Sequence, residues 1–239
     1  MESYPSPRTI ESAGESRREM TPSLCGVVFD MDGVVIDSHP AHRLAWKNFL
    51  HSVGRDTSDD ELDFILEGRK RADILKHFLG ELAPQQIAEY GNRKDELLQK
   101  HRTAIQPMPG LVDFLSQLSE AGIPTAVATS ASRRRAFGTL DELGLTACFR
   151  AIVTGDDVTA GKPDPAIYQL AAERMQESPQ RLLAVEDAAS GVKSARAAGM
   201  RCLGLAPSRR ASLLCAAGAE FVVPDFRSFS FSQLQAHFR

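Results

Sequence analysis

Two acidic residues follow an apolar run near the start of the chain, at a spacing that suits metal-assisted phosphate chemistry. Asp30 and Asp32 come directly after Leu24–Phe29. They are two residues apart, so on an extended backbone their side chains face the same way. Gly33 then lets the chain turn sharply. Two neighbouring carboxylates repel each other unless a cation lies between them, so the pair predicts a site for a hard divalent cation such as Mg²⁺.

Polar residues also follow later apolar runs. Thr129 and Ser130 offer a hydroxyl and backbone N–H groups at the start of a predicted helix, an arrangement that binds anions. Asp187 supplies a third carboxylate, with Glu186 beside it, and Lys162 lies in a Gly-Lys-Pro sequence. Together, a carboxylate nucleophile, a neighbouring acid/base, a metal, a lysine and an N–H cradle indicate phosphoryl transfer through an aspartyl-phosphate.

The runs that carry these residues are typical of buried strands in a parallel sheet. The predicted strands are Leu24–Phe29, Pro124–Thr129, Ala151–Thr154, Leu182–Val185, Cys202–Ala206 and Glu220–Val223. Helical patterns separate them at Leu111–Ala121, Ser132–Leu143, Ala166–Met175, Ala189–Ala198 and Arg209–Ala217. This alternation predicts an α/β fold, a Rossmann-like doubly wound parallel sheet, which binds ligands at the carboxyl ends of its strands.

One stretch shows helical periodicity alone and interrupts the alternation after the first strand. We expect residues 39–104 to form an inserted all-α cap of four helices above the strand ends. Residues 23–38 and 105–239 then form the core, which the chain re-enters through a linker at 106–110. Residues 1–22 have no periodic apolar pattern, so we expect a flexible tail.

Four short motifs resemble those of the haloacid dehalogenase superfamily, in that family's order and across residues 24–225. They are Phe29-Asp30-Met31-Asp32-Gly33-Val34, Thr129-Ser130, Lys162-Pro163 and Val185-Glu186-Asp187-Ala188-Ala189-Ser190-Gly191. The inserted helices resemble that family's mobile four-helix cap. The dehalogenase branch lacks the second Asp of the first motif, so the resemblance favours phosphoryl transfer over dehalogenation.

The resemblance implies a role for each motif residue. Asp30 would be the nucleophile, and Asp32 the general acid that protonates the leaving oxygen and then activates water. Thr129, Ser130 and Lys162 would bind the phosphoryl group. The Mg²⁺ ligands would be the Asp30 side chain, the Asp32 backbone carbonyl and Asp187, with Glu186 beside the metal.

Several cap residues resemble those of β-phosphoglucomutases and related sugar-phosphate phosphatases. The matching segments are His42-Arg43-Leu44-Ala45-Trp46, Gly68-x-x-Arg71 and Arg93-Lys94. In the mutases, the matching His, Arg and Lys close the cap and contact substrate. His42 is equally well explained as a packed residue on an apolar face. Lys94 lies in an apolar stripe of a predicted helix at Gln85–His101, where a charge is costly unless it reaches solvent or an anion.

The chain departs from the mutase pattern after Thr129-Ser130, where Ala131-Ser132-Arg133 replaces Ser-Lys-Asn. A second departure is Ala188, which replaces a frequent Ser. Arg133 could take over the second phosphate-binding role. Arg133, Arg134 and Arg135 fall in the first turn of a predicted helix, where cations oppose the helix dipole and an anionic ligand would relieve the conflict. Alternatively, all three point into water.

Composition excludes several classes of protein. The 239 residues carry a net charge of −3, so there is no cationic excess with which to bind nucleic acid. No apolar run approaches the ~20 residues that span a bilayer. The four cysteines are scattered along the sequence, as expected for reduced thiols in a cytoplasmic protein.

These observations predict a Mg²⁺-dependent phosphatase that acts on a small phosphorylated metabolite, a sugar or polyol phosphate. The alternative is a mutase of the β-phosphoglucomutase type, which needs a second anion site. A third hypothesis is a non-catalytic, phosphate-dependent binding protein. We expect a monomer, with a dimer as the alternative, and no nucleic-acid or membrane partner.

Overall fold

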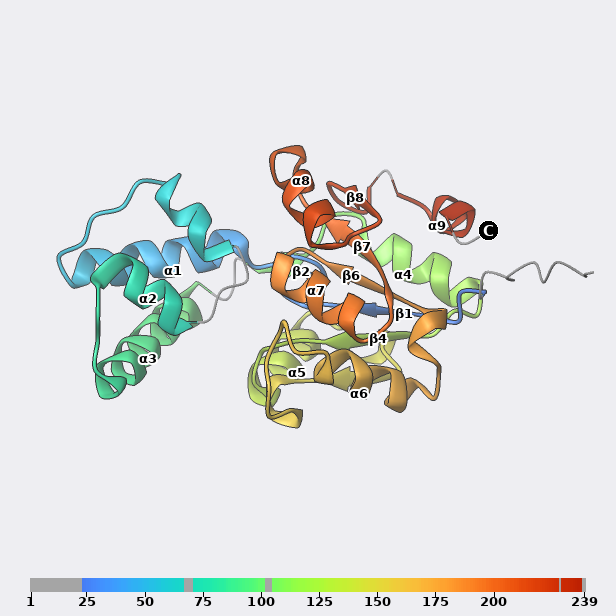
Figure 1. Ribbon diagram of the computed structural model, residues 1–239, viewed down its shortest axis with the longest axis horizontal. Helices are drawn as coiled ribbons and strands as arrows, with labels where there is room; N and C mark the ends of the chain where they lie inside the picture. The colour runs from blue at the N-terminus through green and yellow to red at the C-terminus, as the bar shows by residue number, and fades with distance from the viewer. Residues whose placement is uncertain (1–22, 67–70, 102–104, 228, 238–239) are drawn as a thin grey trace, which may run out of the picture.

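The computed structural model describes residues 23–66, 71–101, 105–227 and 229–237. The predicted tail at 1–22 lies outside this range, as does Gly68 of the Gly68-x-x-Arg71 segment. Figure 1 shows two bodies side by side, a small group of helices at one end and a sheet with its covering helices at the other. Within the described ranges, no helix is long and apolar enough to cross a membrane.

The core is a six-stranded parallel sheet in the order β5-β4-β1-β6-β7-β8. Its strands are β1 (Gly26–Phe29), β4 (Thr125–Ala128), β5 (Ala151–Val153), β6 (Leu182–Glu186), β7 (Arg201–Leu205) and β8 (Phe221–Val223). The chain starts in the middle of the sheet and winds outward in both directions. The carboxyl ends of β1, β4 and β6 therefore lie next to one another, which is where such sheets bind ligands.

Helices cover both faces of this sheet, because its central strands are apolar on both sides. Residues of α4 (Leu111–Glu120), α5 (Arg133–Glu142) and α9 (Phe231–His237) pack on one face with Val27 and Phe29. Residues of α6 (Ala166–Met175), α7 (Ala189–Ala197) and α8 (Ser208–Ala217) pack on the other face with Val28. The predicted doubly wound α/β fold is confirmed.

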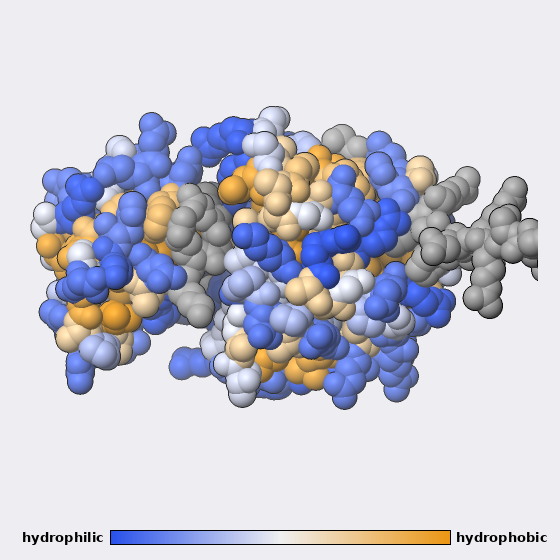
Figure 2. Space-filling model, viewed as in Figure 1, coloured by the Kyte–Doolittle hydropathy of each residue, from blue (hydrophilic) through white to orange (hydrophobic). Residues whose placement is uncertain are grey.

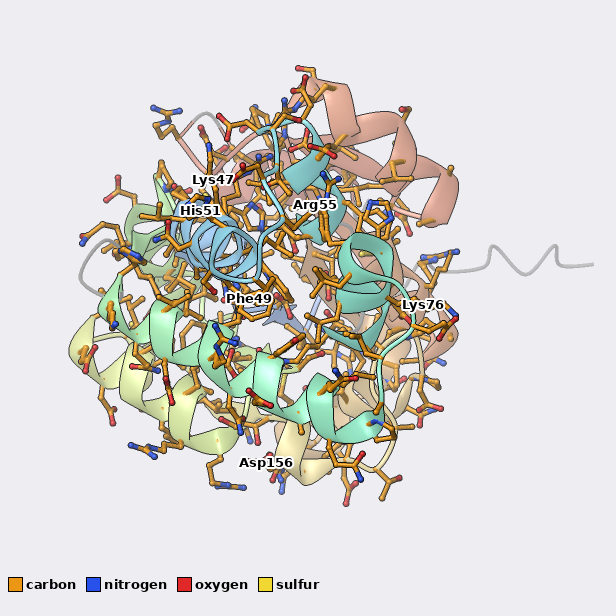
Figure 3. All side chains as sticks on the ribbon, turned by 90° about the vertical axis from the view of Figure 1, so that its left-hand side faces the viewer. Lys47, Phe49, His51, Arg55, Lys76 and Asp156 are labelled. Atoms are coloured by element: carbon orange, nitrogen blue, oxygen red, sulfur yellow. The ribbon has the colours of Figure 1, made fainter. Side chains whose placement is uncertain are left out.

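The cap has its own apolar cluster, built around Trp46, Phe49 and Leu75. Its helices are α1 (His39–Ser52), α2 (Arg71–Leu79) and α3 (Pro84–Lys100), with a 3₁₀ helix, η1, at Glu61–Leu66. Figure 3 looks onto this cap and shows Phe49 beneath α1 on the side toward α3, with Lys47 and His51 on the opposite side. Four helical segments were predicted. The second of them is too short for more than a turn or two, and such segments commonly adopt 3₁₀ geometry.

Two short strands join the cap to the core. β2 (Ile36–Asp37) pairs antiparallel with β3 (Gln106–Pro107), so the outgoing and returning chains are hydrogen-bonded to each other. The sequence predicted a linker at 106–110, but its first two residues are in β3. This pairing fixes the two chain crossings side by side at the base of the cap.

In Figure 2, hydrophilic residues cover much of the visible surface of both bodies, interrupted by apolar patches.

Candidate active site

Three carboxylates meet at the carboxyl ends of β1 and β6. Asp30 follows β1, Glu186 ends β6 and Asp187 comes next, and one oxygen from each lies within 4.8 Å of the other two. The adjacent strands enforce this approach, since the Asp30 N–H donates to the Val185 carbonyl at 2.9 Å. All three residues are buried. Burial raises the pKa of Asp30 well above its ordinary value, and the neighbouring carboxylates add to the effect. This crowding of negative charge is the situation that a bound cation relieves.

Lys162 supplies the positive charge within this cluster. Its Nζ donates to Glu186 Oε1 at 2.6 Å, to the Ala128 carbonyl at 3.0 Å and to Asp30 Oδ1 at 2.5 Å. Burial by itself would lower the pKa of Lys162, but Asp30 and Glu186 raise it above its ordinary value. The ammonium group is therefore charged at neutral pH, within hydrogen-bonding distance of the nucleophile predicted from the sequence.

Glu186 is held in one orientation by several donors. The Tyr168 hydroxyl donates to Oε1 at 2.7 Å, and the N–H groups of Asp187 and Ala188 donate to Oε2 at 3.1 and 3.3 Å. A Cβ on Gly191 would lie 1.9 Å from Oε1, so only glycine leaves room for this carboxylate. Glu186 was predicted to lie beside the metal. Its hydrogen bonds indicate that it orients Lys162 and the strand end.

Asp187 has two basic neighbours that the sequence analysis did not single out. His39 Nε2 lies 2.9 Å from Asp187 Oδ2, and Arg210 donates to the Asp187 carbonyl at 2.7 Å. Gly33 lies against this pair at φ = +80°, and a Cβ there would come within 2.6 Å of Asp187 Oδ2. Gly33 is therefore needed both for its backbone conformation and for its lack of a side chain.

Asp32 turns away from the carboxylate cluster toward another set of donors. The Ser38 hydroxyl donates to Oδ1 at 2.8 Å, and Arg135 donates to both carboxylate oxygens. Burial would raise the pKa of Asp32, but Arg135 and its hydrogen bonds hold that pKa well below its ordinary value. Ser38 is the N-cap residue of α1, yet its side chain makes no capping bond there. The hydroxyl is bonded to the predicted acid/base instead.

Thr129 and Ser130 follow β4 and lie on the same pocket as the carboxylates. Thr129 is buried, and its Oγ1 accepts from the Ala131 N–H at 3.1 Å. Ser130 is exposed to the pocket, and its carbonyl lies 2.6 Å from where a Cβ on Gly155 would be. The segment therefore places a hydroxyl group and backbone amides just before α5, as the anion-site prediction requires.

The cap contributes four of the predicted substrate residues to this pocket, His42, Trp46, Arg71 and Lys94. Lys94 is buried, and its Nζ donates to His42 Nδ1 at 3.1 Å and lies 5.7 Å from the centroid of the Trp46 ring. Burial lowers the pKa of Lys94 from 10.5 to about 8. Arg71 packs against Gly91 and donates to Asp95 at 2.6 Å. Together with the core residues they enclose a cavity of about 420 Å³.

Arg133, the predicted second phosphate contact, is not on this pocket. Its guanidinium donates to Asp157 at 2.6 Å and its side chain is 56% exposed. Arg135 is on the pocket instead, because it lies two residues further around the helix and so projects from a different face of α5. The run of three arginines in the first helical turn indicated an anion-binding residue here, but the rotation of α5 about its axis determines which arginine faces the pocket.

Comparison with known proteins places this arrangement in a family. The family model of haloacid dehalogenase-like hydrolases matches residues 26–199. The chain therefore belongs to the haloacid dehalogenase-like hydrolase family.

Two curated relatives and one solved structure show which members it resembles. The chain is 35% identical to hexitol phosphatase A of Escherichia coli over 73% of its length and 79% of the relative's. It is 31% identical to β-phosphoglucomutase of Bacillus subtilis over 75% and 82% of the two chains. A variant of CbbY from Rhodobacter sphaeroides, in complex with xylulose-(1,5)bisphosphate, superposes with a TM-score of 0.73 at 27% identity, over 88% of this chain and 99% of that one. The similarity thus covers a hexitol phosphatase and a β-phosphoglucomutase, one from each of the two enzyme classes predicted.

Proposed function

We propose that this protein is a Mg²⁺-dependent phosphatase of a small sugar or polyol phosphate, working through an aspartyl-phosphate on Asp30. The observation that carries the proposal is the convergence of Lys162 with Asp30 and Asp187, which lie at adjacent strand ends, and Asp32 lines the same pocket. The relative named above as hexitol phosphatase A supports the substrate class.

The donor set fits Mg²⁺, a hard cation that prefers oxygen ligands and keeps several waters. Asp30 and Glu186 share the single ammonium group of Lys162, so the negative charge of these two buried carboxylates is not fully compensated. The Asp30 and Asp187 side chains and the Asp32 backbone carbonyl would hold the ion, since the Glu186 carboxylate is engaged by other donors. When bound, Mg²⁺ offsets the charge of the carboxylates and of the substrate phosphate, so that an anionic nucleophile and an anionic substrate can meet.

The first half-reaction forms a bond from an Asp30 oxygen to phosphorus and breaks the bond from phosphorus to the sugar oxygen. Lys162, Thr129 and Ser130 bind the phosphoryl oxygens through an ammonium group, a hydroxyl group and backbone amides. Asp32 is ionised while it is paired with Arg135, so it first takes up a proton from solvent and then gives that proton to the departing sugar oxygen. The sugar leaves as a neutral alcohol, and the phosphoryl group remains on Asp30.

The second half-reaction returns the enzyme to its starting state. Asp32, now a carboxylate, takes a proton from a water molecule as that water attacks phosphorus. The bond from phosphorus to Asp30 breaks, inorganic phosphate is released, and Asp32 is again protonated. Asp32 therefore serves as acid in one step and base in the next. This requires its carboxyl group to reach the sugar oxygen and the attacking water, which lie on the side of phosphorus opposite Asp30.

A mutase of the β-phosphoglucomutase type is the second candidate, and the cap cations favour it. Arg71 and Lys94 line the same cavity as Asp30, from the other wall. A mutase must bind a bisphosphate in two orientations and so needs cations at both ends of its pocket. A phosphatase with one phosphate group to bind needs them at one end.

Product analysis separates these candidates. The enzyme is incubated with Mg²⁺ and β-glucose 1-phosphate, with and without a trace of the 1,6-bisphosphate, and glucose 6-phosphate and free phosphate are followed together. Free phosphate supports the phosphatase, and a panel of sugar phosphates then ranks substrates. Fast formation of glucose 6-phosphate with little free phosphate identifies a mutase. Absence of both products across the panel would favour the third hypothesis, a non-catalytic binding protein.

A further inference from the structure

Arg135 forms a two-pronged hydrogen-bonded ion pair with the carboxylate of Asp32. Its Nη1 donates to Asp32 Oδ1 at 2.9 Å, and its Nη2 donates to Oδ2. The Ser38 hydroxyl also donates to Oδ1, at 2.8 Å. A two-pronged contact between guanidinium and carboxylate is among the strongest polar contacts in proteins. Both carboxylate oxygens of Asp32 therefore already accept hydrogen bonds from protein side chains, and neither is free to exchange a proton with substrate or water.

We propose that Arg135 is a positioning residue that holds Asp32 inactive until a second anionic group on the substrate draws the guanidinium away. This inference rests on the proposed function, in which Asp32 exchanges protons with the sugar oxygen and with water. It narrows the substrate class to polyol or sugar phosphates with a second anion, a carboxylate or a phosphate, at the end remote from the reacting phosphate.

The structure offers a place for that second anion. A cavity of about 520 Å³ adjoins the catalytic pocket, and Arg135, Arg71 and Lys94 line both. Arg134 lines the adjoining cavity as well. Among the described residues on its wall, Asp95 is the single carboxylate, and it is paired with Arg71. Positive charge is in excess there, so an anion that enters is attracted toward the side of Arg135 that faces away from Asp32.

Asp32 also has a donor available to replace Arg135. His42 Nε2 is buried, has no hydrogen-bond partner among the described residues, and lies 3.7 Å from Asp32 Oδ1. His42 Nδ1 faces the Lys94 ammonium, which can only donate, so Nδ1 accepts and Nε2 carries the hydrogen. A buried donor without an acceptor costs free energy. Once Arg135 withdraws, Asp32 can settle between Ser38 and His42 with an oxygen directed at the substrate.

A neutral group could not release Arg135 in this way. The Arg135 side chain is 24% exposed, so separation from Asp32 leaves a largely buried guanidinium without its counter-charge. Removing one partner of such a pair is strongly unfavourable. A hydroxyl group does not offset that cost, whereas a carboxylate or phosphate does. The requirement for a second anion follows from this difference.

A matched pair of substrates tests the inference. Sorbitol 6-phosphate and 6-phosphogluconate share the reacting phosphate and the polyol chain and differ at the far end, a neutral alcohol in one and a carboxylate in the other. Initial rates of phosphate release with Mg²⁺ are measured for the wild type, Arg135→Gln and the control Arg133→Gln. Arg133 lies in the same helical turn but pairs with Asp157 outside the pocket.

The wild type is expected to have a kcat about tenfold higher with 6-phosphogluconate than with sorbitol 6-phosphate, the scale of one hydrogen bond to a charged group. Arg135→Gln is expected to raise kcat for sorbitol 6-phosphate and to lower kcat/KM for 6-phosphogluconate, each by about tenfold. Arg133→Gln is expected to match the wild type with both. A merely structural role of Arg135 would not move the two substrates in opposite directions.

Two results would overturn the inference while leaving the proposed function intact. One is equal kcat values for both substrates in the wild type. The other is a parallel fall for both substrates in Arg135→Gln, which would make Arg135 part of the general catalytic apparatus. If Arg135→Gln does not fold, judged by its thermal transition, Arg135→Lys replaces it. Lysine loses the two-pronged contact but keeps the charge, so this variant must raise kcat for sorbitol 6-phosphate and retain kcat/KM for 6-phosphogluconate. No phosphate release from either compound by the wild type would contradict the proposed function itself.

Discussion

The ammonium group of Lys94 in α3 donates a hydrogen bond of 3.1 Å to the imidazole of His42 in α1. This contact joins the two longest cap helices at the wall of the catalytic pocket. Lys94 is 5% exposed, and a buried ammonium that is not fully paired costs folding free energy. A role in function therefore explains Lys94 better than a contribution to stability does, and replacing Lys94 distinguishes the two.

Replacing Lys94 with Met should stabilise the protein and impair catalysis. Met fills a similar volume without the desolvation cost that lowers the pKa of Lys94 to about 8, and the expected gain is about 1–3 kcal/mol in the free energy of unfolding. At the same time, kcat/KM for sugar phosphates should fall by about tenfold or more, because the pocket loses a cation. Urea denaturation and initial rates measure the two effects. Lys100→Met, at an exposed position of the same helix, should change neither. Unchanged kinetics with a loss of stability would show that Lys94 serves packing.

The same lysine predicts a dependence of stability on pH. Between about pH 8 and pH 10.5, Lys94 is neutral in the folded protein, whereas the unfolded chain still binds the proton. Unfolding therefore takes up a proton in this window, and the contribution of Lys94 to the free energy of unfolding increases with pH. The difference in stability between Lys94→Met and the wild type should shrink as pH rises through the window. A difference that stays constant from neutral pH to pH 10.5 would contradict the assigned pKa.

Two glycines in helices should respond in opposite ways to alanine. Gly191→Ala places a Cβ 1.9 Å from Glu186 Oε1, so we expect a loss of about 1–3 kcal/mol of stability and a fall in kcat as Lys162 loses its orientation. Gly138→Ala in α5 meets no atom of the described chain within 4 Å and should stabilise by up to about 1 kcal/mol. Thermal denaturation of both variants makes the comparison. Equal stabilisation of the two would mean that the Glu186 carboxylate does not lie against α7.

Mg²⁺ should stabilise the folded protein through the Asp30 and Asp187 carboxylates that are proposed to hold it. At a concentration a hundredfold above its dissociation constant, the stabilisation is about 2.7 kcal/mol, and chelation should reverse it. Asp187→Asn should remove most of the shift in thermal transition between Mg²⁺ and chelator, because a buried ligand is lost. Asp113→Asn, exposed on α4, should retain it. An identical shift in both variants would place the metal elsewhere.

The layout of the sheet could be predicted because its strands are short, continuous apolar runs with polar ends. Each of the predicted core strands is present with its ends shifted by at most two residues, and the predicted helix Ala166–Met175 is present as such. The pairing of β2 with β3 could not be predicted. Two residues on each side carry no periodic signal, and the pairing depends on where the cap sits. Helix α9 is also a short element that the sequence analysis did not identify.

The residues of the candidate site likewise fall into those that the sequence predicts and those that it does not. Asp30, Thr129 and Asp187 could be predicted because each directly follows a strand, and the sheet brings strand ends together. Asp32 lies two residues beyond Asp30, and Lys162 was predicted from its Gly-Lys-Pro sequence, in a loop well beyond the end of β5. Ser38, His39 and Arg210 could not, since their approach depends on side-chain direction and on how α1 and α8 pack against the core. Arg135 was distinguishable from Arg133 only once the rotation of α5 was known.

Asp30 is the residue that is proposed to carry the phosphoryl group between the two half-reactions. The direct measurement uses Asp32→Asn with p-nitrophenyl phosphate, whose leaving group departs without a proton but whose phosphoenzyme still needs a base for hydrolysis. Rapid mixing with Mg²⁺ should give a burst of p-nitrophenol close to one per enzyme, followed by slow turnover. Peptide mapping after acid quench should find the phosphoryl group on Asp30. No burst, or a phosphoryl group on another residue, would contradict the assignment.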